Sequence, residues 1–266
     1  MSIPRDIREF LEGYPDATDD PNASANLEFY SNRRRCRPDN RLIDEIHEQW
    51  TGNYSKLESK HGYIQWLFPI QEYGMNYQSQ PLQRHEIQAM KADPTIIGRI
   101  TTSYEMMLDF YGMRLVSADS GLVDRSLPPR NYVSNYKNLV RSSHNNLRIS
   151  RILKCLSEFG LEHLNVGFLL HVLCEQSESD NLNTPGIRSS MDRWWTNCIR
   201  NDEERRRVAD LIRKVRAGTD GYVFTRDMYN AAIAKADGVT EMVGGVIESI
   251  DAAAGKATDV AVQPAA

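Results

Sequence analysis

The chain has 266 residues, of which 41% are hydrophobic and 26% are charged, and these are the values of a globular protein. Its 32 basic and 36 acidic side chains give a net charge of −4 at pH 7, which excludes a strongly basic, general nucleic-acid-binding protein. The length is enough for one sizeable hydrophobic core.

The four cysteines lie far apart in the sequence, at Cys36, Cys155, Cys174 and Cys198. Because neither a CxxC pair nor clustered histidines accompany them, the sequence predicts no zinc site, no disulfide framework and no cofactor. This usage favours reduced thiols in a cytoplasmic or nuclear protein. The charged N-terminus lacks the apolar region of a secretory signal, and no apolar run approaches the roughly 20 residues of a membrane-spanning helix. We therefore expect membrane association to be peripheral at most.

The chain begins with a predicted lead-in segment, residues 1–25, in which prolines and an Asp-rich cluster allow at most one short helix, over residues 5–11. The next predicted helix covers residues 42–50, because its apolar residues form one helical stripe and Gly52 follows it. A second short helix, over residues 55–60, leads into an apolar and aromatic stretch.

The clearest helix in the sequence covers residues 94–111. Asp93 is placed to cap its start, apolar residues recur at three- and four-residue spacing, and Gly112 ends it. The stretch that follows, residues 117–131, is rich in Gly, Ser, Asp and Pro, and a Pro-Pro pair near its end cannot continue a helix. We expect a mobile, poorly ordered surface loop there.

Amphipathic patterns predict further helices in the second half of the chain. Residues 146–159 carry an apolar stripe, and the Gly160–Leu161 pair after them is typical of a left-handed helix end. Helical patterns continue over residues 164–176, 187–200 and 202–218. Alternating strand-like patterns are almost absent, so the predicted fold class is all-α.

The predicted domain is a single compact bundle of helices over residues 26–230, with flexible segments at both ends. The tail, residues 231–266, is rich in Ala and Gly and has no aromatic residue after residue 236. One weak helix over residues 243–253 is its only predicted element, since a Gly-Gly pair there lowers helix propensity by about 1 kcal/mol for each glycine.

The stretch "HGYIQWLFPI", from His61 to Ile70, concentrates large apolar side chains around one amide. Tyr63, Trp66 and Phe68 are candidates for an apolar ligand slot, with Gln65 fixing the ligand by hydrogen bonds. The alternative is that these aromatic side chains belong to the core and that the backbone satisfies Gln65. We place packing first and a pocket second.

The predicted helix over residues 146–159 carries Arg148 and Arg151 three positions apart, on one face. Two guanidinium groups there can hold a carboxylate or phosphate, and His144, Asn145 and Asn146 add polar groups near a helix start, where free N–H groups favour an anion. The alternative is that the arginines extend an ordinary solvated face or bond to the preceding loop, with one of the three polar residues acting as a helix cap.

Catalytic and metal-binding interpretations have less support. Cys155 with His144 or His163 supplies the ingredients of a thiol nucleophile and base, but Cys155 borders the apolar stripe and fits a small buried side chain better. His61, His144 and His163 lack the close spacing or neighbouring acids of a metal site. The sequence also contains no Gly-rich phosphate loop, no Gly-x-Ser-x-Gly elbow and no HExxH motif.

Six segments together resemble the conserved domain of the opioid growth factor receptor family, in the family's order and over residues 26–200. They are "NLEFY" (Asn26–Tyr30), "HGYIQWLFPI" (His61–Ile70), "QPLQRHEI" (Gln80–Ile87), "YEMMLDFYGMRL" (Tyr104–Leu115), "SHNNLRISRILKCLSEFGLEHL" (Ser143–Leu164) and "TPGIRSSM" (Thr184–Met191).

The resemblance implies a receptor module without seven membrane helices that binds a small enkephalin peptide, takes part in growth-regulating signalling and lies in the nucleus or at the periphery of the nuclear envelope. It also implies binding rather than catalysis. The expected partners are a small peptide or anionic ligand, with a protein partner as a further candidate and no nucleic acid. The alternative function is an uncharacterised enzyme that acts on a small anionic substrate through the cluster from His144 to Arg151.

Overall fold

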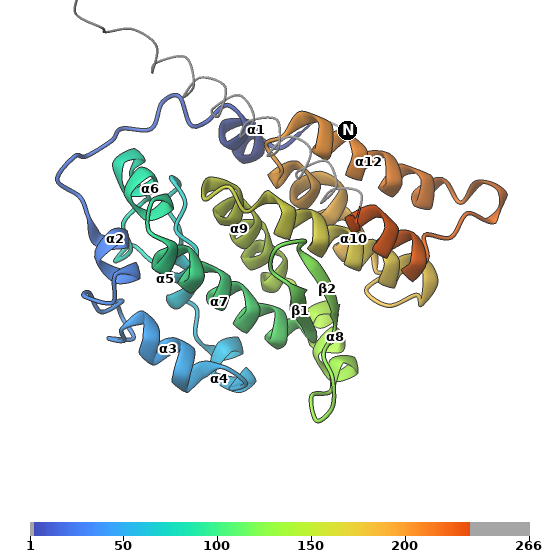
Figure 1. Cartoon of the computed structure of the whole chain (residues 1–266), viewed down its shortest axis with the longest axis horizontal. Helices are drawn as coiled ribbons and strands as arrows, with labels where there is room; N and C mark the ends of the chain where they lie inside the picture. Colours follow the sequence, from blue (N-terminus) through green and yellow to red (C-terminus); the bar gives the residue numbers. More distant parts are fainter. Residues whose placement is uncertain (1–2, 235–266) are drawn as a thin grey trace, which may run out of the picture.

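The computed structural model describes residues 3–234, and helices form most of the regular structure in this part of the chain, as predicted (Figure 1). The first half contains α1 (Arg5–Leu11), α2 (Ala25–Tyr30), α3 (Ile43–Trp50), α4 (Tyr54–Ser59), α5 (Tyr63–Leu67), α6 (Arg84–Lys91) and α7 (Pro94–Tyr111). The helices of the second half are α8 (Tyr132–Arg141), α9 (His144–Glu158), α10 (Glu162–Glu178), α11 (Pro185–Ser190) and α12 (Asp202–Ala217).

Three short helical turns complete these elements: η1 (Met191–Trp195), η2 (Thr196–Cys198) and η3 (Thr219–Gly221). The region from 187 to 200, predicted as one helix, is therefore α11 followed by a π-helical and a 3₁₀ turn. Residues 226–234 are also helical, and they include the start of the predicted tail. The weak helix predicted over residues 243–253 lies outside the described residues.

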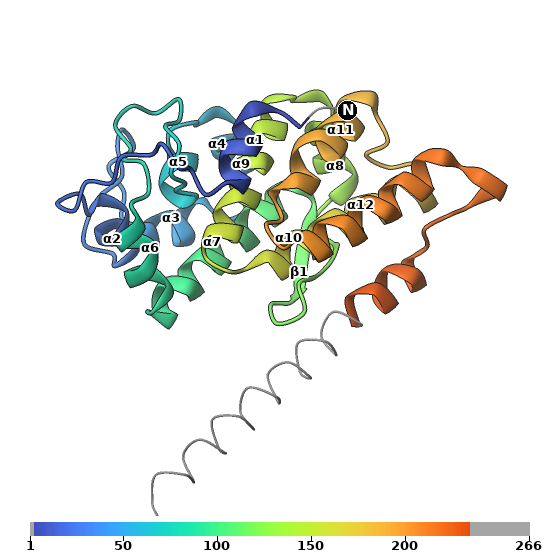
Figure 2. The same cartoon turned by 90° about the horizontal axis from the view of Figure 1, so that it is seen from above.

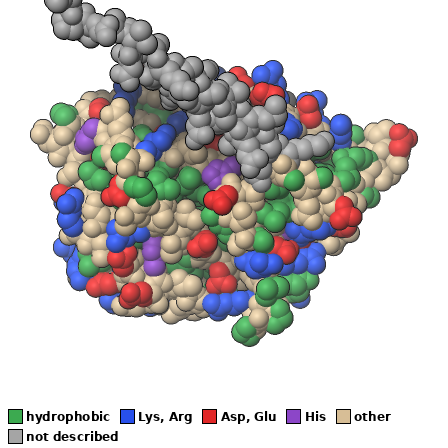
Figure 3. Space-filling view, viewed as in Figure 1, with side chains coloured by type: hydrophobic (Ala, Val, Ile, Leu, Met, Phe, Trp, Pro, Cys, Tyr) green, Lys and Arg blue, Asp and Glu red, His purple; other side chains and the backbone are tan. Residues whose placement is uncertain are grey.

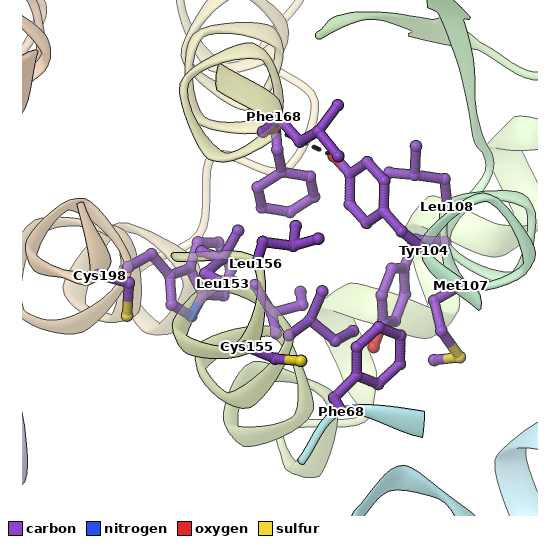
Figure 4. Packing of buried hydrophobic residues seen from close by; sticks show 14 of the residues in the cluster. Phe68, Tyr104, Met107, Leu108, Leu153, Cys155, Leu156, Phe168 and Cys198 are labelled. Carbon is purple, nitrogen blue, oxygen red and sulfur yellow. Dashed lines mark hydrogen bonds between the residues drawn. The ribbon is translucent and has the colours of Figure 1, made fainter. Parts of the chain in front are cut away.

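The centre of the fold is α10, in which every residue from Leu164 to Gln176 is buried. A helix that is buried on all sides must be surrounded by other elements, and α9, α12 and the β-hairpin all pack against it. Figure 4 shows how side chains of α7, α9 and α10 meet in the core, with Tyr104 of α7 facing Phe168 of α10. The Tyr104 hydroxyl donates to the carbonyl oxygen of Leu164 at 3.3 Å, so its one polar atom is also satisfied.

The predicted loop over residues 117–131 is wrong in its central part. An antiparallel hairpin is formed there by β1 (Met113–Ser117) and β2 (Leu122–Arg125), with Leu115 opposite Val123. The backbone of Val123 is bonded to the hydroxyl of Tyr229, which accepts from its N–H at 2.8 Å and donates to its carbonyl at 3.1 Å. The hairpin is thus held by a residue about a hundred positions later, which a local pattern does not reveal.

The first helix, α1, lies where the lead-in segment was predicted to allow one, and it packs against η2. Ile7 and Phe10 have no exposed surface, and Lys154 of α9 reaches the carboxylate of Asp6 at 3.1 Å. In Figure 2 the N-terminal segment runs across the molecule from α1, which lies next to α9. Within residues 3–234, none of the helices combines the length and apolar character needed to cross a membrane.

Candidate functional site

The aromatic residues of the stretch from His61 to Ile70 lie in the core. Tyr63 and Phe68 have no exposed surface and Trp66 is 2% exposed. The indole N–H of Trp66 donates to the carbonyl of Arg37 at 2.9 Å, and the Tyr63 hydroxyl donates to that of Leu57 at 3.0 Å. These side chains fill space between α4, α5 and their neighbours, so they present no open apolar slot.

Gln65 is also nearly buried, at 8% exposure. With its amide oriented to satisfy its hydrogen bonds, the nitrogen donates to the carbonyl oxygens of His61 and Gly62, each at 3.2 Å. Gly74 passes directly over it, since a Cβ atom built on Gly74 would lie 2.6 Å from Cγ of Gln65. The Gln65 side chain therefore stabilises the turn that precedes it through hydrogen bonds and packs against the backbone at Gly74.

Arg148 is buried against the end of α4 and does not extend a solvated face. Its Nη1 donates to the carbonyl of Leu57 at 2.9 Å and to Oδ1 of Asn145 at 3.2 Å, while its Nη2 donates to the carbonyl of Lys60 at 2.7 Å. The ring of His61 also lies 2.9 Å from Nη2. The guanidinium is thus committed to partners within the protein.

Of the three polar residues at the start of α9, His144 and Asn145 share one partner and Asn146 contacts another element. His144 Nε2 lies 2.8 Å from a carboxylate oxygen of Glu58, and Asn145 donates to the other oxygen of Glu58 at 3.4 Å. Burial raises the pKa of Glu58, but the hydrogen bonds from Asn138 and Asn145 and the charges of His144 and Arg148 together leave the pKa below its usual value. Asn146 faces another element, where its carbonyl accepts from the indole of Trp195 at 3.1 Å.

His61 lies beside this cluster, with its ring 5.8 Å from that of His144 in an edge-to-face arrangement. Desolvation, followed by the charges of Arg148 and His144, lowers the pKa of His61 below its usual value. No group of three His, Cys, Asp or Glu side chains within residues 3–234 is arranged to hold a metal ion.

The thiol of Cys155 is fully buried, and burial raises its pKa well above the usual value. His163 is directed elsewhere, with Nε2 2.9 Å from the carbonyl of Ala118. The two residues therefore do not form the nucleophile–base pair that the sequence suggested as an alternative.

A second polar cluster, missed by the sequence analysis, lies behind the hairpin. His171 of α10 is fully buried, and its Nε2 is 3.0 Å from the hydroxyl of Tyr136. One turn later Glu175 makes two bonds to Arg125, at 2.7 and 2.8 Å. Burial, together with the nearby arginines, lowers the pKa of His171 well below its usual value. His171 and Glu175 are four residues apart, a spacing that places both on one helix face, but their partners Tyr136 and Arg125 come from distant segments.

Arg151 differs from Arg148 in the partners of its guanidinium. Its Nε donates to the carbonyl of Phe68 at 2.8 Å, and among residues 3–234 this is its one hydrogen bond. Burial lowers the pKa of Arg151 to about 10. The chain at Gly74 passes close above it, since a Cβ atom there would lie 3.1 Å from Nη1. The terminal nitrogens of Arg151 thus have no hydrogen-bond acceptor among residues 3–234.

An open groove of about 680 Å³ lies between residues 5–23 and the loop from Gln71 to Gln83. Its lining includes Tyr14 and Tyr73 and the charged residues Arg5, Glu9, Asp16, Asp20 and Glu72. A volume of this size lies within the range of about 300–1,000 Å³ that is usual for small-ligand sites. The sequence analysis missed this groove, because its two walls are separated by roughly fifty residues that carry no shared motif.

The carboxylates of the groove differ in their partners. Glu72 accepts from the hydroxyl of Tyr14 at 2.7 Å and from Lys154 at 2.6 Å, and Glu9 pairs with Arg5 at 2.6 Å. Asp16 is exposed, and its carboxylate has no hydrogen bond to the described part of the chain, while Asp20 accepts from the N–H of Asn22 at 3.0 Å. The face in Figure 3 shows acidic and basic side chains intermixed. The groove, in contrast, has four carboxylates and one guanidinium on its wall.

Comparisons with known proteins agree on one family. Residues 19–228 match the model of the family described as the opioid growth factor receptor conserved region. The human opioid growth factor receptor is 40% identical over 206 residues, which are 77% of this chain and 30% of that protein. The rat opioid growth factor receptor-like protein 1 is 34% identical over 222 residues, 83% of this chain and 46% of the relative. The chain thus spans less than half the length of these relatives. No solved structure matches the chain.

Proposed function

The chain belongs to the opioid growth factor receptor conserved-region family, and from this premise we propose that it is a non-catalytic module that binds small peptides of the enkephalin type. The observation that carries the proposal is the groove between residues 5–23 and the loop from Gln71 to Gln83, whose wall carries Asp16 and Asp20, neither of which forms an ion pair with the described residues, while the guanidinium of Arg151 makes one hydrogen bond. A zwitterionic peptide needs an acceptor for its amine, a cation for its carboxylate and an apolar contact.

In this proposal the peptide amine meets Asp16 and Asp20 and the peptide carboxylate meets the terminal nitrogens of Arg151. An aromatic side chain of the peptide packs on Tyr73, whose ring is 83% exposed at the rim. Of the binding residues proposed from the sequence, Arg151 keeps its part in the site. Outside the lining of this groove lie Tyr63, Gln65, Trp66, Phe68, His144, Asn145, Asn146 and Arg148, so they are not part of the proposed contact surface.

The test is isothermal titration of the purified chain with an enkephalin-type pentapeptide and with the same peptide acetylated at its amine. Replacing Asp16→Asn or Arg151→Met removes one charge-assisted contact, and each substitution is expected to weaken binding by about ten- to a hundredfold. Asp119→Asn, at the exposed tip of the hairpin, is the matched control and leaves binding unchanged.

Acetylation removes the charged amine, so it weakens binding to the parent chain but adds little loss in the Asp16→Asn protein. Equal binding of both peptides, or binding that survives Asp16→Asn and Arg151→Met, would contradict this placement of the ligand.

The remaining parts of the proposal concern the cell. We extend the family's implied role to growth-regulating signalling, in the cytoplasm or nucleus and with peripheral attachment to the nuclear envelope. Imaging of a fluorescent fusion, followed by salt extraction of isolated nuclei, tests the location. A fusion that resists high salt and leaves the envelope only in detergent would contradict peripheral attachment.

A further inference from the structure

The loop after α5 exposes three large side chains at alternate positions. Tyr73 is 83% exposed, Met75 is 94% and Tyr77 is 88%, and each exceeds the 73% of Leu147, the next among the exposed large apolar residues of the described chain. Single exposed apolar side chains need no explanation, but three within five residues form a surface patch. We define Tyr73, Met75 and Tyr77 as the loop triad.

The intervening residues of the loop face inward and anchor it. Glu72 holds Tyr14 and Lys154, and Gly74 lies against Gln65 and Arg151. Asn76 donates its amide to the carbonyls of Arg37 at 2.7 Å and Gly62 at 2.9 Å. At the base of the loop the N–H of Leu82 donates to the carbonyl of Ile70 at 2.9 Å. The loop therefore has a defined backbone, while the triad contributes nothing to holding it.

A pre-organised loop that carries exposed tyrosines and a methionine has the properties of a protein-binding surface. Tyrosine supplies a large contact area at low entropic cost, and a fixed backbone reduces the ordering cost of binding. Methionine adapts its shape to different apolar neighbours. Burial of the triad by a partner thus uses side chains that the fold itself does not need.

The charge beside the triad specifies the partner. The groove that Tyr73 borders has four carboxylates, from Glu9, Asp16, Asp20 and Glu72, against the single guanidinium of Arg5. A basic segment is attracted to this wall, and arginine in particular also stacks on tyrosine rings. Figure 2 shows the loop after α5 at the edge of the molecule, next to the N-terminal segment that forms the opposite wall.

We infer that the loop triad is the docking surface for an extended, arginine-bearing apolar segment of a partner protein. Its apolar side chains cover Met75 and Tyr77, and its arginines lie over Tyr73 and toward the groove carboxylates. This inference goes beyond the proposed pentapeptide site, because Met75 and Tyr77 lie outside the lining of the groove.

The test uses four labelled 12-residue peptides that alternate arginine with leucine, arginine with serine, glutamate with leucine, and glutamate with serine. Fluorescence anisotropy with the full chain is expected to give binding of the arginine–leucine peptide at least about tenfold tighter than binding of the other three. The loop variant Tyr73→Ser/Met75→Ser/Tyr77→Ser loses about tenfold or more of this affinity.

The matched control is the variant Leu127→Ser/Val133→Ser/Leu147→Ser, which removes three exposed apolar side chains elsewhere and keeps the affinity. Circular dichroism verifies that both variants are folded. The inference is overturned if the arginine–leucine peptide does not bind, if the glutamate–leucine peptide binds equally well, or if the loop variant binds like the parent. Sedimentation that shows dimers of the parent and monomers of the loop variant would assign the triad to self-association instead.

Pentapeptide titration of the double variant Met75→Ser/Tyr77→Ser separates this inference from the proposed function. The variant is expected to retain its affinity for the pentapeptide and to bind the arginine–leucine peptide more weakly. The two sites are supported independently if Asp16→Asn and Arg151→Met weaken pentapeptide binding while the double variant binds the pentapeptide like the parent. A parent chain that binds the arginine–leucine peptide but no pentapeptide contradicts the proposed function alone.

Discussion

The Nη2 atom of Arg148 lies 2.7 Å from the carbonyl oxygen of Lys60, and this bond joins α9 to the C-terminal end of α4. The last carbonyl groups of a helix lack partners within the helix, and a cation there is favoured by the helix dipole. Nη1 adds a bond to the carbonyl of Leu57 in the same turn. Arg148 therefore closes the end of another helix.

We predict that Arg148→Met destabilises the protein by about 3–5 kcal/mol, because it removes the hydrogen bonds that the buried guanidinium makes to the carbonyl groups of Leu57 and Lys60 and to Asn145. Urea denaturation measures the loss, and Arg141→Met on the exposed end of α8 is the control, with a change within about 0.5 kcal/mol. An Arg148→Met protein of unchanged stability that loses a ligand would mean that the guanidinium serves binding and not the fold.

Trp66→Ala is predicted to cost about 3–5 kcal/mol, since the side chain is 2% exposed and its ring centre lies 5.4 Å from that of Phe29. The substitution also leaves the carbonyl of Arg37 with one donor fewer. The melting temperature and urea midpoint give the measurement. Retention of both values would place the indole at an exposed surface and would contradict its burial.

The protein is predicted to lose stability as the pH is lowered, because one buried histidine resists protonation in the folded state. Burial lowers the pKa of His47 to about 4, and its Nε2 lies 2.8 Å from the hydroxyl of Ser103. Above pH of about 6.5 both folded and unfolded forms carry a neutral ring, so the stability is complete. As the pH falls from about 6.5 to 4, only the unfolded chain takes up the proton, and the free energy of unfolding drops by about 3 kcal/mol.

The measurement is urea denaturation between pH 7 and 4, for the parent and for His47→Gln. Because carboxylates also titrate near the lower end of this range, the informative quantity is the difference between the two proteins. The parent is expected to lose its advantage over the variant as the pH falls. Parallel pH profiles would refute the assignment to His47.

Gly167→Ala is predicted to destabilise the protein by about 3 kcal/mol or more. A Cβ atom there would lie 1.7 Å from the backbone carbonyl of Gly121 at the tip of the hairpin, so backbone must move to admit it. Gly98→Ala in α7 is the matched control, since nothing lies within 4 Å of its Cβ position. There alanine is expected to stabilise by about 0.5–1 kcal/mol, through helix propensity. Similar thermal denaturation midpoints for the two variants would contradict the close approach of hairpin and α10.

The groove was not predictable in the same way as the helices. Its walls come from residues 5–23 and from the loop between Gln71 and Gln83, which meet through contacts such as the bond from the N–H of Asp20 to Gln83 at 2.7 Å. Neither wall has a periodic pattern, so the sequence offered no reason to place them together. The exposed loop triad was equally hidden, because isolated apolar residues between polar ones do not reveal whether the fold buries or exposes them.

Local signals by themselves determined the long helices. The predicted start and end of α7 at Asp93 and Gly112 agree with a side-chain cap at 2.8 Å to the N–H of Thr95 and with a left-handed glycine at φ 86°. The physical reason is that capping and periodicity act within a few residues, and the chain carries that information wherever it folds.

Tertiary structure alone decided the strand at Leu122–Arg125 and the burial of Arg148. The strand depends on its bonds to Tyr229. Arg148 lies on a charged face of α9 that the sequence analysis expected to be solvated, and it is buried because the end of α4, about ninety residues earlier, packs on that face. A charged side chain is buried wherever unpaired carbonyl groups surround it, and which carbonyl groups those are depends on packing between distant segments.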